Sequence, residues 1–162
     1  MPNEGDFGNP NETMIAELSD GRVMLVTRSV SKANRKLVTT SPDGARNWTK
    51  PVFHDQLWEP ICMASIAAHP SKPGTLIFSN PHTLPLDESG KEIPGGKGKR
   101  ENLSIKLSRD DGKTWPVNKV LDPGKAAYSD LAVLPDGTVL CLYEADNNIV
   151  CARFNLEWIT AP

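Results

Sequence analysis

A stretch of eight residues, Ser108-Arg109-Asp110-Asp111-Gly112-Lys113-Thr114-Trp115, constrains the fold of this chain more than any other feature. Asp110 is a short acceptor that can bond backbone N–H groups in its own turn. Gly112 supplies a backbone conformation that a side chain would penalise. Thr114 and Trp115 resume a strand, and the indole can cover the turn from one side. The spacing therefore predicts a hairpin tip whose polar groups bond one another, the alternative being an ordinary Asp-Gly hairpin before a tryptophan.

Short strands and turns recur along the whole chain. A related stretch at 41–48 keeps the serine, the first aspartate and the tryptophan, with Ala45 and Asn47 in place of the glycine and the threonine. Asp-Gly turns between β-branched runs predict hairpins, and no segment is convincing as a helix. The pattern divides a single domain, 1–162, into three repeat units whose spacing is typical of propeller blades: about 12–58, 59–120 and 126–160.

A long polar insertion, 81–101, interrupts the second unit. It is rich in glycine and proline and contains a basic run formed by Lys97, Lys99 and Arg100. We interpret it as a mobile solvent loop, and a loop at the rim of a substrate site is the alternative.

Composition excludes several classes of protein. The net charge of −2 argues against a nucleic-acid-binding surface, and no apolar run is long enough to span a membrane. Cys62, Cys141 and Cys151 have no metal-ligand spacing. Buried thiols are the favoured interpretation, and a disulfide between Cys141 and Cys151 is left open.

Three blades do not close a propeller, because closed propellers have about 4–8 blades. The chain is therefore expected to be an incomplete all-β propeller. It would be part of a longer protein, associate with itself, or leave a sheet edge exposed.

Over about residues 9–159 the sequence resembles the C-terminal half of the six-bladed catalytic propeller of bacterial exo-α-sialidases. The eight-residue stretch is similar to the Asp box of that family, in which the positions of Ser108, Asp110, Gly112, Thr114 and Trp115 are structural. The resemblance implies a sialidase-type β-propeller with about three blades present. Further matching motifs occur in the family's order: Asn11-Glu12-Thr13, Glu17-Leu18-Ser19-Asp20-Gly21-Arg22, Arg28, Ala127-Tyr128-Ser129-Asp130-Leu131, Leu134-Pro135-Asp136-Gly137 and Tyr143-Glu144.

The resemblance implies a retaining glycosidase that releases terminal sialic acid, or a related acidic sugar, without a cofactor or a metal. Sialidases use a tyrosine nucleophile, and a neutral phenol avoids the repulsion that a carboxylate would meet from the substrate's own carboxylate. A free tyrosine has a pKa of about 10 and needs a base. By position, Tyr128 is the nucleophile and Glu12 its base. Glu144 either supports the tyrosine or is a rim carboxylate.

The family clamps the substrate carboxylate with three arginines, since a guanidinium matches a carboxylate bidentately. Arg28 aligns with the second arginine. The third is expected two residues before the box serine, where this chain has Lys106, which keeps the charge and loses the fork. The first arginine and the acid/base aspartate belong to N-terminal blades that match no segment here.

The expected partners are therefore a sialylated glycan and the N-terminal half of a propeller, or a second copy of the chain. Family members are often exported, which implies an extracytoplasmic location. The alternative function is a non-catalytic carbohydrate-binding propeller or a decayed sialidase paralogue. Lys106 favours that alternative, whereas the retention of Glu12 and Tyr128 argues against it.

Overall fold

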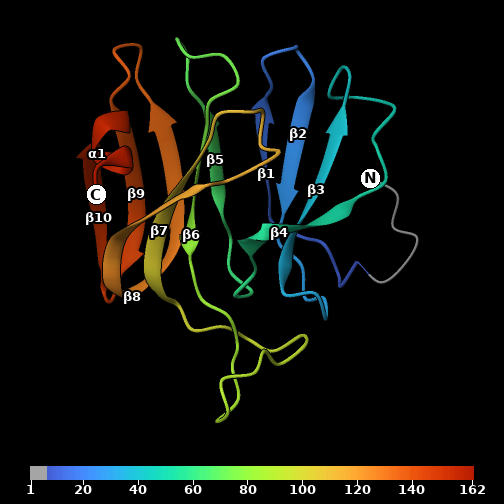
Figure 1. Ribbon diagram of the computed structural model, residues 1–162, viewed down its shortest axis with the longest axis vertical. Helices are drawn as coiled ribbons and strands as arrows, with labels where there is room; N and C mark the ends of the chain where they lie inside the picture. The colour runs from blue at the N-terminus through green and yellow to red at the C-terminus, as the bar shows by residue number, and fades with distance from the viewer. Residues whose placement is uncertain (1–6) are drawn as a thin grey trace.

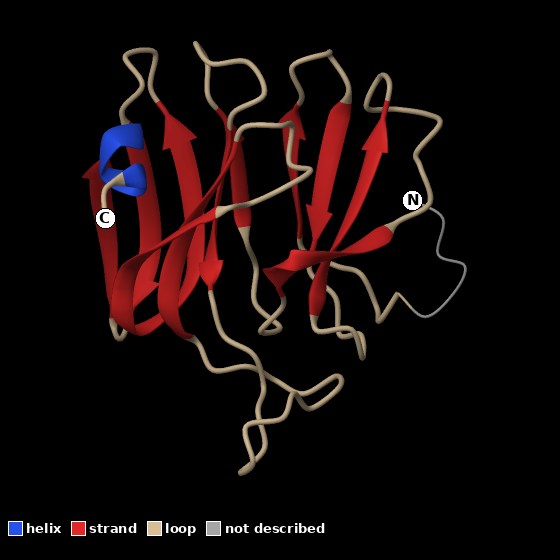
Figure 2. Cartoon of the chain, in the orientation of Figure 1, coloured by secondary structure: helices blue, strands red, loops and turns tan. Residues whose placement is uncertain are grey.

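The computed structural model describes residues 7–162, and its regular secondary structure is almost entirely antiparallel strand (Figure 2). Residues 1–6, which belong to the expected domain 1–162, lie outside the described residues. The described elements are β1 (Thr13–Glu17), β2 (Val23–Thr27), β3 (Arg35–Ser41), β4 (Val52–Trp58), β5 (Ser65–Ala68), β6 (Leu76–Pro81), β7 (Glu101–Ser108), β8 (Val117–Val133), β9 (Val139–Ala145), β10 (Asn148–Phe154) and α1 (Leu156–Thr160).

The strands form two sheets that stand side by side (Figure 1). The first has the order β1-β2-β3-β4, and the second has the order β10-β9-β8-β7-β6-β5. The 17-residue strand β8 links two parts of the second sheet, because its first half pairs with β7 and its second half pairs with β9. The chain is thus all-β, as expected. Sequence reasoning did not predict β4 or the first half of β8.

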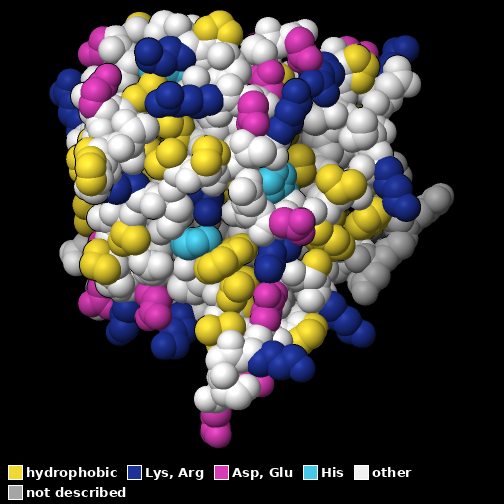
Figure 3. Space-filling view, viewed as in Figure 1, with side chains coloured by type: hydrophobic (Ala, Val, Ile, Leu, Met, Phe, Trp, Pro, Cys, Tyr) yellow, Lys and Arg dark blue, Asp and Glu magenta, His cyan; other side chains and the backbone are white. Residues whose placement is uncertain are grey.

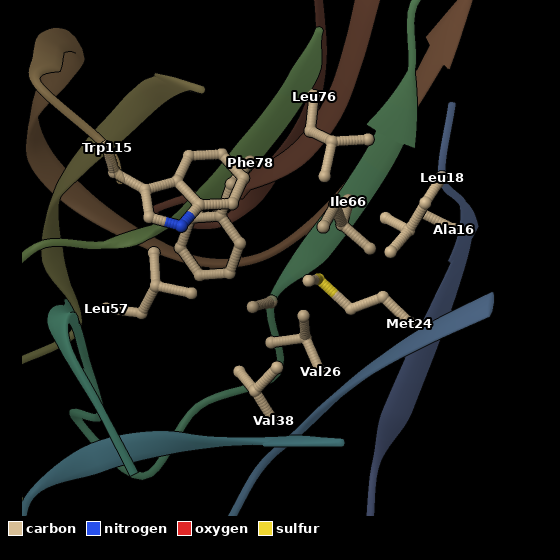
Figure 4. Close-up of a cluster of buried hydrophobic side chains, with 11 residues drawn as sticks. Ala16, Leu18, Met24, Val26, Val38, Leu57, Ile66, Leu76, Phe78 and Trp115 are labelled. Atoms are coloured by element: carbon tan, nitrogen blue, oxygen red, sulfur yellow. The ribbon is translucent and has the colours of Figure 1, made fainter. Parts of the chain in front are cut away.

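Apolar side chains fill two clusters, one on each side of β6. The first cluster includes residues of both sheets, with Phe78 and Trp115 tilted at 58° and their ring centroids 5.7 Å apart (Figure 4). The second gathers around Ile77, Leu103 and Val139, all fully buried. Burying one large apolar side chain contributes about 1.5–3 kcal/mol, so the clusters hold neighbouring strand groups together.

The predicted self-bonded hairpin tip is present after β7. Ser108 Oγ donates to Asp110 Oδ1 over 2.7 Å, and the amide and hydroxyl of Thr114 donate to the two Asp110 oxygens over 2.9 and 2.7 Å. Gly112 has φ +76°, and a Cβ there would come within 2.9 Å of Met24 Cε. The tip therefore needs glycine both for its conformation and for the close approach of the neighbouring sheet.

The degenerate stretch at 41–48 makes a similar tip after β3. Asp43 Oδ1 accepts from the Arg46 amide over 2.8 Å, and Ser41 Oγ accepts from the Gly44 amide over 3.0 Å. The loss of the glycine and threonine consensus residues therefore leaves the aspartate and serine bonds intact.

Two local features concern the end of the chain and the cysteines, and of these the helix was not predicted. A five-residue helix, α1, follows β10, with Asn155 Oδ1 accepting from the Trp158 amide over 3.0 Å at its N-terminus. Cys141 and Cys151 are both free thiols, and the favoured interpretation as buried thiols is confirmed for Cys141 but wrong for Cys151, which is exposed. Cys141 lies opposite Ala152, one position away from Cys151 across the β9–β10 pair, and successive side chains point to opposite faces of a sheet. The disulfide that was left open is therefore not formed.

Candidate active site

Glu12 and Arg28 meet because β1 and β2 are antiparallel neighbours. Glu12 precedes β1 and Arg28 follows β2, and the Arg28 amide donates to the Glu12 carbonyl over 2.8 Å. The Asp20-Gly21 turn at the far end of this hairpin sets the register Thr13↔Thr27. The hairpin thus delivers a carboxylate and a guanidinium to the same end of the first sheet.

Tyr128 comes from the other sheet, at an irregularity in β8. Ala126 pairs with Ala145 and Ser129 pairs with Tyr143, so β8 has one extra residue at this point. Bulges of this kind redirect a side chain and are common beside active sites. The Tyr128 amide donates to Glu144 Oε2 over 3.2 Å. Of the two interpretations of Glu144, this bond favours support of the tyrosine over a carboxylate at the rim of the site.

The two residues after Tyr128 fix this segment to β6 and β5. Ser129 Oγ lies 2.8 Å from Ser79 Oγ on β6, and Ser65 Oγ on β5 donates to Asp130 Oδ1 over 2.9 Å. Ser129, Ser79 and Ser65 are almost fully buried. The tyrosine is therefore carried by a short segment bonded on both sides.

Glu12, Arg28 and Tyr128 form one hydrogen-bonded cluster. The Tyr128 hydroxyl donates to Glu12 Oε1 over 2.6 Å, and Arg28 Nη1 donates to Glu12 Oε2 over 2.6 Å and to the Tyr128 hydroxyl over 3.1 Å. Burial raises the pKa of Glu12, but the hydrogen bonds from Tyr128 and Arg28 outweigh it and leave that pKa below its ordinary value. Glu12 is therefore an ionised acceptor placed on the phenolic proton.

The Arg28 guanidinium keeps bonding capacity beyond this cluster. Its side chain is 17% exposed, and its Nε is buried without a hydrogen-bond partner among the described residues. Both of its side-chain bonds use Nη1. Free guanidinium N–H groups at a partly open site are suited to an external carboxylate.

A buried ion pair lies behind Arg28. Lys36 Nζ is 2.9 Å from both carboxylate oxygens of Glu59, and it also donates to the Cys62 carbonyl. Glu59 in turn accepts from the amides of Ser29 and Cys62, each over 3.1 Å. The side chains of Lys36 and Glu59 are 0% and 1% exposed. Because Ser29 follows Arg28 directly, this network fixes the backbone that carries the arginine.

Lys106 does not join this cluster. It lies on β7 opposite Phe78, 5% exposed, and no hydrogen bond or salt bridge links its side chain to residues 7–162. Burial lowers its pKa to about 8. Each strand residue advances the chain by about 3.3 Å, so Lys106 lies well along β7 toward the Asp box, whereas β7 begins at the end of the sheets that holds Glu12 and Arg28 (Figure 1).

Arg100, which sequence reasoning did not select, lies beside Tyr128. Its guanidinium carbon lies 5.2 Å from the centre of the Tyr128 ring, and its carbonyl accepts from the Ala126 amide over 3.1 Å. Arg100 Nε is buried without a partner among the described residues. Arg100 stands directly before β7, and this boundary between loop and strand was the available signal. Counting back from the box serine led instead to Lys106, which lies five residues beyond the first residue of β7.

The structure reveals neither a metal site nor a membrane span within residues 7–162. No group of three or more His, Cys, Asp or Glu side chains in this part of the chain could hold a metal ion. None of its helices has the length and apolar character needed to cross a bilayer.

A family model described as "BNR repeat-like domain" matches residues 3–141. The chain belongs to this family. The predicted resemblance to bacterial sialidases is confirmed by the relatives of the chain.

Among the relatives of this BNR-repeat chain are two sialidases. One, from Micromonospora viridifaciens, is 36% identical over 156 residues, which is 92% of this chain and 22% of that protein. Another, from Bacteroides fragilis, is 33% identical over 146 residues, covering 85% of this chain and 24% of that protein. The chain thus spans less than a third of the length of these relatives.

Solved structures support the incomplete propeller fold. The Hadza microbial sialidase Hz136 superposes with a TM-score of 0.75 at 33% identity, over 94% of this chain and 29% of that one. An intramolecular trans-sialidase from Ruminococcus gnavus superposes with a TM-score of 0.74 at 20% identity, over 96% and 34%. At this lower identity the likeness concerns the fold alone.

Proposed function

We propose that this chain forms the nucleophile side of a retaining exo-α-sialidase-like glycosidase that releases terminal sialic acid or a related acidic sugar. The observation that carries the proposal is the 2.6 Å hydrogen bond from the Tyr128 hydroxyl to Glu12. A tyrosine within reach of an ionised carboxylate is the arrangement that a phenolic nucleophile requires.

In the first step Glu12 takes the phenolic proton while Tyr128 Oη attacks the anomeric carbon. The bond to the leaving oxygen breaks, and a covalent tyrosyl–glycosyl intermediate forms. The leaving oxygen departs as an aryloxide from an aryl substrate, or takes a proton from a general acid outside this cluster with a natural substrate. In the second step water attacks the same carbon and gives up a proton to solvent or to that same outside group, the bond to Tyr128 breaks, and Glu12 returns its proton to the phenolic oxygen. Two displacements at one carbon give retention of configuration.

Arg28 and Arg100 would bind the substrate carboxylate. Arg28 bonds both Glu12 and Tyr128, and Arg100 lies over the Tyr128 ring. Two guanidinium groups around one tyrosine place positive charge where an anionic sugar must dock. We assign no substrate contact to Lys106.

Further blades would complete the site. We place the general acid for a natural leaving group outside the cluster formed by Glu12, Arg28 and Tyr128. General acid catalysis is typically worth about 10²–10⁴-fold. The completing blades would come from additional polypeptide or from a second copy of the chain.

The second candidate function is a carbohydrate-binding propeller without turnover. The unused bonding capacity of Arg28, whose Nε has no hydrogen-bond partner among residues 7–162, suits the binding of an acidic sugar with or without turnover. The same arginines would then hold an acidic sugar while Tyr128 acts only as a hydrogen-bond donor.

Hydrolysis of an aryl sialoside by the purified chain, beside its Tyr128→Phe variant, tests the proposal. An aryl leaving group needs little acid assistance, so turnover is expected from the Glu12–Tyr128 pair. Turnover that disappears in the variant supports the proposal. If a folded wild-type chain gives no turnover but binds free sialic acid, the binding function replaces the enzymatic one.

A further inference from the structure

A cavity lies beside the candidate active site, under the loop between β6 and β7. Its volume is about 620 Å³, within the size range of small-ligand sites. Trp58 and His82 line its inner side, Pro85 and Ile93 line its wall, and Lys97 stands at its rim. Figure 3 shows hydrophobic side chains gathered just above the projecting loop, with basic side chains near them.

The inner side of this cavity is a rigid, uncharged aromatic pair. The rings of Trp58 and His82 stack with centroids 3.8 Å apart and an angle of 16° between them. Asn80 Nδ2 donates a hydrogen bond to the Trp58 carbonyl over 2.8 Å. Burial, and to a lesser extent the charge of Lys106, lowers the pKa of His82 to about 4, so the imidazole is neutral at neutral pH.

The loop that forms the wall is attached to the first sheet rather than free in solvent. Asn34 Nδ2 donates to Glu92 Oε1 and to the Ile93 carbonyl over 2.9 and 2.8 Å, and Asn34 Oδ1 accepts from the Gly95 amide over 2.9 Å. Arg35 forms an ion pair with Glu92 at 2.9 Å. A preformed cavity loses less conformational entropy when it binds a ligand.

The cavity and the candidate active site share one backbone segment. Lys99 and Glu101 line the cavity, whereas Arg100, between them, lies over the Tyr128 ring. The backbone bends at Arg100, so the side chains that line the cavity and the one that lies over Tyr128 diverge from the same three residues. The cavity and the candidate active site are therefore neighbours, and a glycan that passes over residues 99–101 would contact both.

We propose that this cavity binds an acidic oligosaccharide, namely an inner arm of the glycan whose terminal sugar lies at Tyr128; in this respect the inference rests on the proposed function. The indole and imidazole would take the apolar face of a sugar ring, since aromatic rings combine a large apolar surface with defined geometry.

The basic rim selects an anionic arm over a neutral one. Lys97 is exposed and has no salt-bridge partner among residues 7–162, and Lys99 meets Glu101 only at 3.6 Å with 81% of its side chain exposed. An exposed pair of this kind is weak, so a sulfate or carboxylate on the sugar can compete for Lys99.

Titration of the full chain with 3′-sulfolactose, with lactose as the neutral comparison, tests the proposal. Binding is read by tryptophan fluorescence and calorimetry. We expect the sulfated sugar to bind more tightly than lactose and Trp58→Ala to weaken binding about tenfold. Lys97→Glu should also weaken it and increased salt should reduce it, whereas Lys50→Glu, at an exposed lysine elsewhere, should leave it unchanged.

The Arg28→Lys variant distinguishes binding of the sugar in this cavity from binding in the candidate active site. If binding of 3′-sulfolactose survives Arg28→Lys and fails in Lys97→Glu, the cavity is the binding site. If binding fails only in Arg28→Lys, or the sulfated sugar does not bind the wild-type chain at all, the proposal is wrong. Lys97 is exposed, so Lys97→Glu is expected to fold. It therefore tests the cavity even if Trp58→Ala does not fold. Aryl sialoside turnover is measured separately, so loss of one function is distinguishable from loss of the other.

Discussion

The hydroxyl of Tyr128 donates a 2.6 Å hydrogen bond to Glu12, a residue 116 positions earlier in the chain that stands directly before the first strand of the other sheet. This bond joins the two sheets at the end where β1 begins and β2 ends. The candidate nucleophile and its base are thus assembled by the packing of blades against each other. Anything that shifts one sheet relative to the other separates them.

Glu12→Gln is expected to reduce aryl sialoside turnover by about 10²–10⁴-fold, because an amide keeps the shape of the side chain and cannot accept the phenolic proton. Glu17→Gln, at an exposed glutamate at the other end of β1, is the matched control and should keep wild-type turnover. Equal rates for wild type and Glu12→Gln would contradict the assigned role.

The pH dependence of the same reaction should reflect the lowered pKa of Glu12. A carboxyl whose pKa is lowered stays ionised to lower pH, so its function as a base is lost only when the pH falls through that lowered value. The acid limb of the wild-type rate profile is therefore expected below the ordinary range of a glutamate. In Arg28→Lys the Nη1 bonds disappear and the limb should move upward. A limb that does not move would show that another group controls it.

Arg100→Lys is expected to raise KM for the sialoside about tenfold or more while the chain stays folded, because lysine retains the charge and loses the bidentate fork. Arg109→Lys, at an exposed position beyond β7, should change neither KM nor kcat. If Lys106→Arg lowers KM and Arg100→Lys has no effect, the clamp position expected from the sequence is the right one.

Lys106→Met should stabilise the chain at neutral pH by a few kcal/mol, since each pKa unit corresponds to ~1.4 kcal/mol. The pKa of Lys106 is about 8 in the folded chain, below its value of 10.5 when unperturbed. The unfolded chain therefore binds more protons between these values, and stability rises with pH in that window. The free energy of unfolding in urea should increase from pH 7 to pH 9.5 in the wild type and increase less in Lys106→Met. An equal increase in both chains would contradict the lowered pKa of Lys106.

Glu59→Gln should destabilise the chain by about 3–5 kcal/mol, because it leaves the fully buried Lys36 ammonium without its counter-charge. The double variant Lys36→Met/Glu59→Met should lose less than Glu59→Gln alone. Glu59 also accepts from the Cys62 amide, and Ile61, between these two residues, has φ +62°. Because this conformation is unfavourable for a β-branched residue, loss of the Glu59 bonds should also release this segment. Urea unfolding compares the three chains, and a double variant less stable than the single one would contradict this account.

Local sequence patterns predicted the features that depend on neighbouring residues. The tip formed by Ser108, Asp110 and Thr114 closes through bonds within seven positions, and its geometry follows from residue types alone. The hairpin between β1 and β2 is equally local. The strand β4 escaped prediction because its polar residues, such as His54 and Gln56, bond the neighbouring hairpin tip at Gly112 and Trp115, which no local pattern reveals.

The sequence by itself determined the all-β class, the Asp-box turns, and the identity of Glu12, Arg28 and Tyr128 as candidate site residues through a family resemblance. Only the tertiary structure decided which basic side chain accompanies Tyr128. Arg100 and Lys106 lie near the same strand, and their spacing in the chain says nothing about which end of that strand faces the site. The pairing of β1 with β2 and the bulge in β8 settle that question, because they bring together residues about a hundred positions apart.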